Sequence, residues 1–265
     1  MESDWTFEVG GISLTLVGPT VWIEPFAQGW APWAGGSPGR EVHLVQDTTL
    51  PTPTGSFLMA RPRFAGGRCL LEASGFVGKI APEEELVLLR AHPAAKPDDL
   101  AYFVRTTFAL RAFDQGALLF HAAGVVHHGV AYAFFGHSGS GKTTAARLSE
   151  GKPVLNDDLL LLRPTKTGWE AYATPFGRRR IPEVRSAPLR ALLRLVQATE
   201  ERLAPMSRGR ALGELVANFP VVNADPIRSQ ALLARCEEIL QTETVSLLQF
   251  RRSDTFWEVI DAHFG

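Results

Sequence analysis

The sequence predicts an α/β protein with a mixed sheet, in which a smaller β-rich domain at residues 1–98 precedes a larger domain at residues 99–265. Short alternating runs of apolar and polar residues, separated by Gly- and Pro-rich turns, are typical of strands and fill the first part. A buried strand, a glycine-rich loop and a helix follow one another at residues 130–148, which is typical of an α/β domain. The Pro- and Asp-containing stretch 92–99 marks the expected boundary.

The first domain is expected to begin with a β-hairpin. Residues 5–9 and 12–16 alternate between apolar and polar side chains, and Gly10-Gly11 lies between them, which favours a tight turn. Further strands are expected at residues 21–23, 41–46, 57–63 and 68–73, with loops at 28–40 and 50–56. This domain could serve in substrate recognition.

The second domain is expected to open with a helix, because apolar residues from Leu100 to Leu110 recur at helical spacing. A strand at residues 117–126, a turn at 127–129 and a strand at 130–135 should follow. After the helix at 142–148, the pattern predicts strands at 154–156, 159–162, 169–173 and 245–250, and helices at 188–198, 210–219, 226–241 and 255–263.

Composition and charge exclude several classes of protein. The 265 residues carry a net charge of −1, so the chain lacks the basic surface typical of nucleic-acid-binding proteins. No apolar run approaches 18 residues, and the acidic N-terminus does not resemble a signal peptide, so neither a membrane partner nor export is expected. Cys69 and Cys236 are far apart in the sequence and suit inert thiols in a reducing compartment. A cytoplasmic protein is therefore expected.

The strongest motif is a phosphate-binding loop with the sequence Gly136-His137-Ser138-Gly139-Ser140-Gly141-Lys142-Thr143-Thr144. It fits G-x-x-x-x-G-K-[ST]; its glycines allow tight turns, so that backbone N–H groups can face a bound anion. Lys142 would supply a positive charge for the β- and γ-phosphates, and Thr143 a hydroxyl for Mg²⁺. The preceding strand and following helix are the context that this motif requires, so the sequence predicts binding of ATP and Mg²⁺.

Three other features could supply the chemistry of phosphate transfer, which needs an acidic metal ligand and, in a kinase, a base. Asp157 and Asp158 follow a short strand, where one could reach the metal and the other the acceptor hydroxyl; a solvated acidic pair is the alternative. His121 interrupts an apolar strand and could equally be a core residue. In the basic run 178–180, Arg180 or a neighbour could stabilise phosphoryl charge, or the run could be a solvated or partner-docking loop.

Residues 120–158 resemble the HPr kinase/phosphorylase family, and more closely the HPr-kinase-related kinases found beside modified-peptide pathways. The resemblance rests on the His-bearing strand 120–126, the phosphate-binding loop and Asn156-Asp157-Asp158, and it covers about residues 99–180. It implies a P-loop domain of the phosphoenolpyruvate-carboxykinase type. It also implies that His121 lies near the transferred phosphate, that Asp157 is the base, and that Asp158 lies toward the metal. The chain departs from the family at residues 175–180, which replace an acidic Glu-x-x-Gly-Leu-Gly stretch.

Together these features predict an ATP- and Mg²⁺-dependent kinase that phosphorylates a hydroxyl, expected to be a serine, on a peptide or small protein. One alternative is an ATP-binding regulatory or partner module with little catalysis. Another is a small-molecule enzyme, either a metabolite kinase or a carboxykinase. The sequence leaves open the identity of the acceptor, the preference for ATP over GTP, and homo-oligomerisation.

Overall fold

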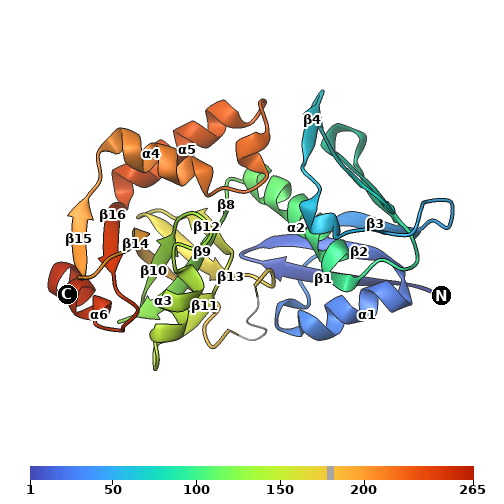
Figure 1. Cartoon of the computed structure of the whole chain (residues 1–265). Coiled ribbons are helices and arrows are strands. Elements are labelled where there is room, and N and C mark those ends of the chain that lie inside the picture. The colour runs from blue at the N-terminus through green and yellow to red at the C-terminus, as the bar shows by residue number, and fades with distance from the viewer. Residues whose placement is uncertain (178–181) are drawn as a thin grey trace. The chain divides into compact units, whose positions relative to one another are not determined.

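The computed structural model describes residues 1–177 and 182–265. It divides into two compact units, Met1–Gln115 with Ala224–Ile227 and Gly116–Asn223 with Arg228–Gly265 (Figure 1). Each unit combines helices with a mixed sheet, in agreement with the predicted α/β class. The first unit extends beyond the boundary expected near residue 98, because the helix α2 (Pro97–Asp114) belongs to it.

The N-terminal unit is built on a seven-stranded sheet in the order β1-β2-β3-β7-β6-β5-β4. Its strands are β1 (Glu2–Val9), β2 (Ile12–Pro19), β3 (Arg40–Gln46), β4 (Arg63–Ala65), β5 (Arg68–Ala73), β6 (Phe76–Ala81) and β7 (Leu86–Ala91). The pairs β2–β3 and β3–β7 are parallel, and the others are antiparallel. The predicted hairpin is confirmed: Gly10 and Gly11 have φ values of 56° and 80°, as a two-residue turn between twisted strands requires.

Two predictions in this unit are wrong. The strand expected at residues 21–23 is part of the helix α1 (Thr20–Gly29), which buries Trp22, Ile23 and Phe26 along one side. Three apolar residues in a row do not distinguish a buried strand from a helix, and here tertiary packing decides. The strand expected at 57–63 is a short 3₁₀ turn, Phe57–Met59, followed by β4.

Helix α2 packs on the N-terminal sheet, which explains its place in this unit. Phe108 stacks on Phe7 of β1 with ring centroids 6.0 Å apart. A Cβ at Gly78 of β6 would lie 2.7 Å from the Phe103 ring, so the glycine makes room for the helix. Asp99 Oδ1 accepts a hydrogen bond of 2.7 Å from the backbone N–H of Phe57. Residues 97–114 thus complete the first core rather than opening the second.

Where the structure describes it, the C-terminal unit contains a nine-stranded mixed sheet, whose main path is β11-β9-β10-β14-β13-β12-β8. On its edge β16 pairs with β14 in parallel and with β15 in antiparallel orientation. Its strands are β8 (Leu118–Phe120), β9 (Ala122–His127), β10 (Val130–Phe135), β11 (Val154–Asn156), β12 (Leu160–Pro164), β13 (Trp169–Ala173), β14 (Ser186–Gln197), β15 (Arg202–Pro205) and β16 (Thr244–Phe250). Its helices are α3 (Lys142–Leu148), α4 (Arg208–Ala217), α5 (Ser229–Thr242) and α6 (Phe256–Phe264).

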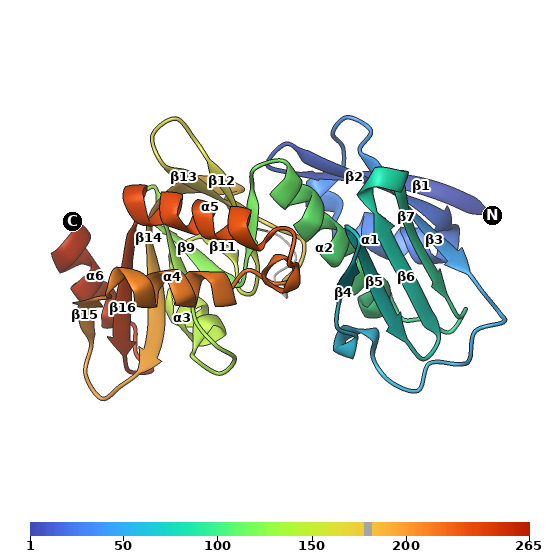
Figure 2. The same ribbon diagram turned by 90° about the horizontal axis from the view of Figure 1, so that it is seen from above.

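Successive residues of β10 point to opposite faces of this sheet and so enter different parts of the core. Phe134 packs with Ala145 of α3 and with Phe256 and Trp257 of α6. Phe135 faces the other way and packs on Phe120, which in turn contacts Phe219, just after α4. Helices α4 and α5 lie side by side along the sheet (Figures 1 and 2).

The helix expected at residues 188–198 is wrong, because this segment is the long strand β14. Its leucines and alanines favour a helix in isolation, but β14 lies between β10 and β16 and pairs in parallel with both. The strand expected at 117–126 is interrupted at His121, where the chain leaves β8 and enters β9. The strands β8 and β9 pair with different neighbours, β12 for the former and β10 and β11 for the latter.

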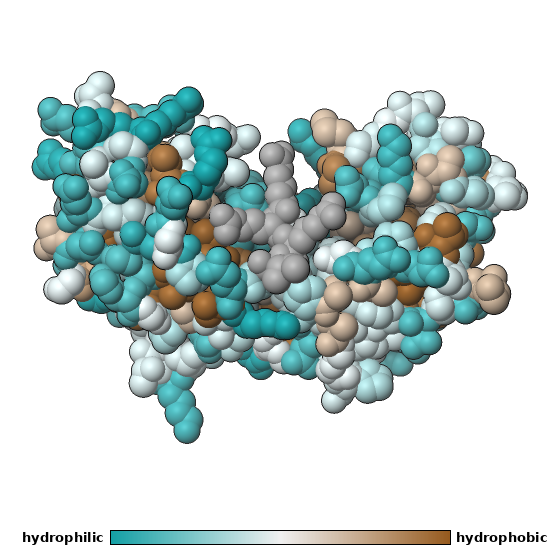
Figure 3. All heavy atoms as spheres, turned by 90° about the horizontal axis from the view of Figure 1, so that it is seen from below, coloured by the Kyte–Doolittle hydropathy of each residue, from teal (hydrophilic) through white to brown (hydrophobic). Residues whose placement is uncertain are grey.

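Among the helices that the structure describes, none combines the length and the apolar character that a membrane crossing requires. On the face drawn in Figure 3, the hydrophobic residues of each unit lie in separate small patches among hydrophilic ones. Exposed large apolar side chains include Met59, Ile227 and Val21, which come from separate parts of the chain.

Candidate functional site

Sheet register brings the residues of interest to one end of the C-terminal sheet. Strand β9 is antiparallel to β10 and pairs Ala122 with Phe135, so His121 lies beside Gly136, where the phosphate-binding loop begins. Strand β11 is also antiparallel to β9 and ends at Asn156, which pairs with Gly124. The loop, His121 and the acidic pair therefore meet at the end of this sheet.

The phosphate-binding loop has the backbone that its glycines allow. Gly136, Gly139 and Gly141 have φ values of 141°, 80° and 111°, which L side chains rarely adopt. A Cβ at Gly141 would lie 2.6 Å from Cζ of Phe250 on β16, so the glycine also permits close packing. The Ser140 side chain is buried, and the described residues offer its hydroxyl no hydrogen-bond partner. Residues 137–139 are exposed, so the outer part of the loop is accessible to a ligand.

Lys142 is the residue that the loop encloses. Its Nζ donates hydrogen bonds to the carbonyl oxygens of Gly136, at 2.8 Å, and His137, at 3.3 Å, and only 8% of the residue is exposed. Burial lowers the pKa of Lys142; the negative charge of Asp158 opposes this shift, and the positive charge of Arg194 adds to it. The Lys142 ammonium group is therefore close enough to both Asp158 and Arg194 for their charges to affect its pKa.

His121 and Asp158 form an ion pair, with 3.1 Å between Nε2 of the imidazole and Oδ1 of the carboxylate. Their side chains are 38% and 42% exposed, so the pair is open to solvent while its backbone is anchored. The backbone N–H of His121 donates to the carbonyl of Asn218 at 2.8 Å. The structure thus brings together two residues that are 37 positions apart in the sequence.

Asn156 organises the turn that carries the acidic pair. Its Oδ1 accepts hydrogen bonds from the backbone N–H groups of Asp158, at 2.7 Å, and Leu159, at 2.9 Å. Its Nδ2 donates to the carbonyl of Thr174 at 2.8 Å, and the whole residue is buried. A Cβ at Gly177 would overlap this side-chain amide, so the glycine leaves room for it. Asn156 was not predicted to have a role of its own, although its place before two aspartates was a usable signal.

Arg194 is a second residue of the site that was not predicted from the sequence. It lies on β14, and the parallel register pairs it with Phe135, directly before the phosphate-binding loop. Its Nη1 donates to the carbonyl of Leu195 at 2.6 Å, its Nε lies 3.1 Å from a carboxylate oxygen of Glu214, and its side chain is 11% exposed. The signal was hidden because residues 188–198 were expected to form a helix, which would not place Arg194 beside the loop.

The other predicted residues divide into three groups. Thr143 is exposed and Thr144 half-buried in the first turn of α3, directly after Lys142. Asp157 is 8% exposed and so is less accessible than Asp158, which also contacts His121. Arg180 and its neighbours at 178–181 lie outside the described residues.

This arrangement combines a loop with glycine-dependent turns, an enclosed ammonium group, a second cation and a histidine–carboxylate pair. Such a set can bind an anion and place a base and a metal-binding carboxylate beside it. In comparisons with known proteins, no family model and no curated protein matches this chain.

Proposed function

We propose that this chain is a kinase that transfers the γ-phosphate of ATP, with Mg²⁺, to a hydroxyl of a peptide or small protein. The observation that carries the proposal is the enclosed Lys142 ammonium beside the His121–Asp158 pair. The acceptor, expected to be a serine, follows from the resemblance of residues 120–158 to HPr-kinase-related kinases. The same resemblance, together with the antiparallel β9–β10 hairpin that leads into the loop, supports a domain of the phosphoenolpyruvate-carboxykinase type.

The residues present suit a nucleoside triphosphate and its metal ion. The loop offers accessible backbone at residues 137–139, and Lys142 supplies charge compensation. Ser140 adds a buried hydroxyl that has no hydrogen-bond partner among the residues described. Thr143 and Asp158 offer the oxygen ligands that Mg²⁺ prefers. Bound MgATP would supply the phosphoryl group and neutralise part of its charge.

Each side chain then has a defined part in the transfer. Lys142 exchanges its contacts with loop carbonyls for contacts with phosphate oxygens, and Arg194 adds a second positive charge beside the last residue of β10. Asp157 accepts the proton of the acceptor hydroxyl as the hydroxyl oxygen takes the phosphoryl group and ADP leaves. His121 orients Asp158 through their ion pair.

The test is transfer from γ-labelled ATP in the presence of Mg²⁺, with peptides and small proteins encoded beside the gene as acceptors. Lys142→Ala should abolish label on the acceptor, whereas Lys166→Ala, in an exposed turn between β12 and β13, should not. Asp157→Asn should abolish transfer but retain ATP binding, which also shows that the variant folds. Transfer that survives in Lys142→Ala, or ATP binding with no acceptor labelled, would contradict the proposal; the second result would favour a regulatory module.

Arg194 can be tested against a neighbour on its own strand. Arg194→Met should reduce transfer about 100-fold if the guanidinium stabilises phosphoryl charge. Arg190→Met, four residues earlier on β14, removes an exposed guanidinium that stacks on Phe264 and should retain activity. Equal losses in both variants would mean that β14 needs its arginines for folding rather than for the site.

A further inference from the structure

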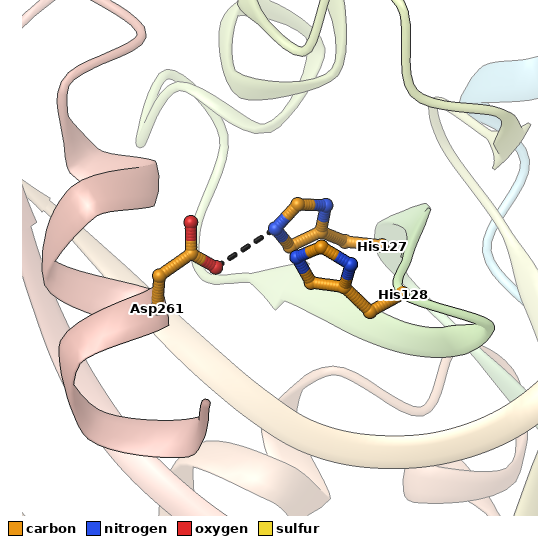
Figure 4. A group of neighbouring side chains, drawn as sticks. All are labelled: His127, His128 and Asp261. Atoms are coloured by element: carbon orange, nitrogen blue, oxygen red, sulfur yellow. Dashed lines mark hydrogen bonds and ion pairs between the residues drawn. The ribbon is translucent and has the colours of Figure 1, made fainter.

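The turn of the β9–β10 hairpin carries a second cluster of ligand-type side chains, away from the phosphate-binding loop. His127 ends β9 and His128 follows it, while Asp261 lies on α6 (Figure 4). Strand β10 runs from this turn to the loop, and its six residues span about 17 Å. The cluster therefore does not belong to the proposed nucleotide site.

The three side chains converge closely enough to share one ion. One ligand atom from each residue lies within 4.8 Å of the others, and His127 Nε2 is 2.8 Å from Asp261 Oδ1. Figure 4 shows the two imidazole rings side by side, with the carboxylate reaching toward them from α6. In a tetrahedral zinc site, metal–ligand distances of about 2.0–2.2 Å place the ligand atoms about 3.4 Å apart. Small side-chain rotations would suffice to close the cluster around a metal.

Backbone geometry explains why two consecutive histidines are neighbours in space. Adjacent side chains of a strand normally point to opposite faces. His128 instead has a φ of 50° and Gly129 a φ of 79°, and this left-handed turn brings the His128 ring to 3.9 Å from the His127 ring. Asn-Gly is the preferred pair for such a turn, so an imidazole at this position is not required by the backbone.

The other side of the cluster is held by the core. The His127 side chain is 13% exposed, and its ring lies 4.8 Å from the Trp257 ring. Trp257 and Ile260 are buried and anchor α6, so the position of Asp261 is set by the residue before it. His127 and Asp261 are thus pre-positioned, and only His128, on the exposed turn, needs to adjust.

We propose that His127, His128 and Asp261 form a site for a divalent transition-metal ion of the zinc class. Two imidazoles and one carboxylate suit such an ion, whereas Mg²⁺ prefers oxygen ligands alone. Three protein ligands leave a fourth position for water. The ion would join the β9–β10 turn to α6, and its binding would stabilise the folded chain.

The test is calorimetric titration of the chelator-treated, tag-free protein with Zn²⁺, in excess Mg²⁺ to occupy oxygen-only sites. One zinc per chain is expected, together with a rise in melting temperature. His128→Asn retains a favoured Asn-Gly turn while it removes the ligand, and Asp261→Asn preserves shape; each should weaken binding at least about tenfold. His263→Asn changes the exposed histidine of α6, two residues after Asp261, and is the matched control.

Three results would overturn the site: no saturable binding of zinc, affinity unchanged in His128→Asn and Asp261→Asn, or equal loss in the His263→Asn control. The His121–Asp158 pair could also attract zinc, but binding there would not respond to His128→Asn. The proposal is independent of phosphate transfer and is tested without any nucleotide. Cobalt substitution offers a second readout, because a tetrahedral site with nitrogen ligands gives a visible absorption that the two ligand variants should lose.

Discussion

Asn156→Asp is the sharpest test of how the acidic turn is held. The substitution preserves shape and keeps an oxygen for the N–H groups of Asp158 and Leu159. It replaces the Nδ2 donor with a second oxygen, which faces the carbonyl of Thr174. Leaving that carbonyl unpaired costs about 1–3 kcal/mol. Because the site is buried, the pKa of the new carboxyl should rise above its usual value. Each pKa unit of this rise corresponds to about 1.4 kcal/mol of lost stability when the group is ionised.

We therefore expect a loss of about 3 kcal/mol in the free energy of unfolding at pH 7. The loss should depend on pH in a defined direction. A carboxyl whose pKa is higher in the folded than in the unfolded state makes its full contribution to stability at a pH below its pKa in the unfolded state, about 4. The protonated group can then donate a hydrogen bond to Thr174. That contribution is lost as the pH rises through the folded pKa, so the deficit of Asn156→Asp should grow from acid to neutral pH.

The assay is hydrogen exchange of peptides from residues 154–173 at increasing urea concentration, which reports this unit alone. Asn223→Asp, at an exposed asparagine, is the control and should change stability by less than about 0.5 kcal/mol. A loss of less than about 1 kcal/mol at pH 7, or one that does not vary with pH, would show that Asn156 does not organise the turn.

Other predictions follow from single contacts. Gly141→Ala should cost about 1–3 kcal/mol in thermal stability and weaken ATP binding, since the new Cβ meets Phe250 at a φ of 111°; unchanged binding would argue against this loop conformation. Hydrogen bonds, above all the one from Thr255, lower the pKa of Glu201 to about 2. Glu201→Gln should therefore destabilise the protein at pH 7, and the destabilisation should become smaller as the pH falls from 4.5 toward 2. Burial raises the pKa of the Cys236 thiol to about 12, so alkylation of the native protein should be slow until urea unfolds it.

Local sequence predicted the parts of the site that depend on local chemistry. The glycine spacing at residues 136–141 specifies backbone turns that few other residues permit, so the loop conformation agrees with the motif. Helix α3 and the strand before it also lie where the motif requires. These features depend on neighbours in the sequence, and the prediction of them did not require knowledge of the sheet.

The prediction of a helix at residues 188–198 was wrong because this segment pairs in parallel with strands that are distant in the sequence. The segment of β14 is rich in Leu, Ala and Arg, which favour a helix, and its leucine spacing fits one. Its place between β10 and β16 is a tertiary fact, because parallel neighbours must come from distant segments. Arg194 was missed for the same reason: only the strand register places it beside the phosphate-binding loop.

Polar residues that interrupt the buried strands mark the places where the chain passes from one strand to the next. His121 separates β8 from β9, and the acidic pair separates β11 from β12. The strands β8 and β12 pair with each other, as do β9 and β11, so both interruptions mark the crossing between the same two parts of the sheet. Because both segments pass from one pair of antiparallel strands to the other at this point, the polar residues between their strands lie close together. This accounts for the 3.1 Å between Nε2 of His121 and Oδ1 of Asp158. A buried strand gains nothing from such a residue in its interior, whereas a crossing exposes it at the end of the sheet, next to Gly136.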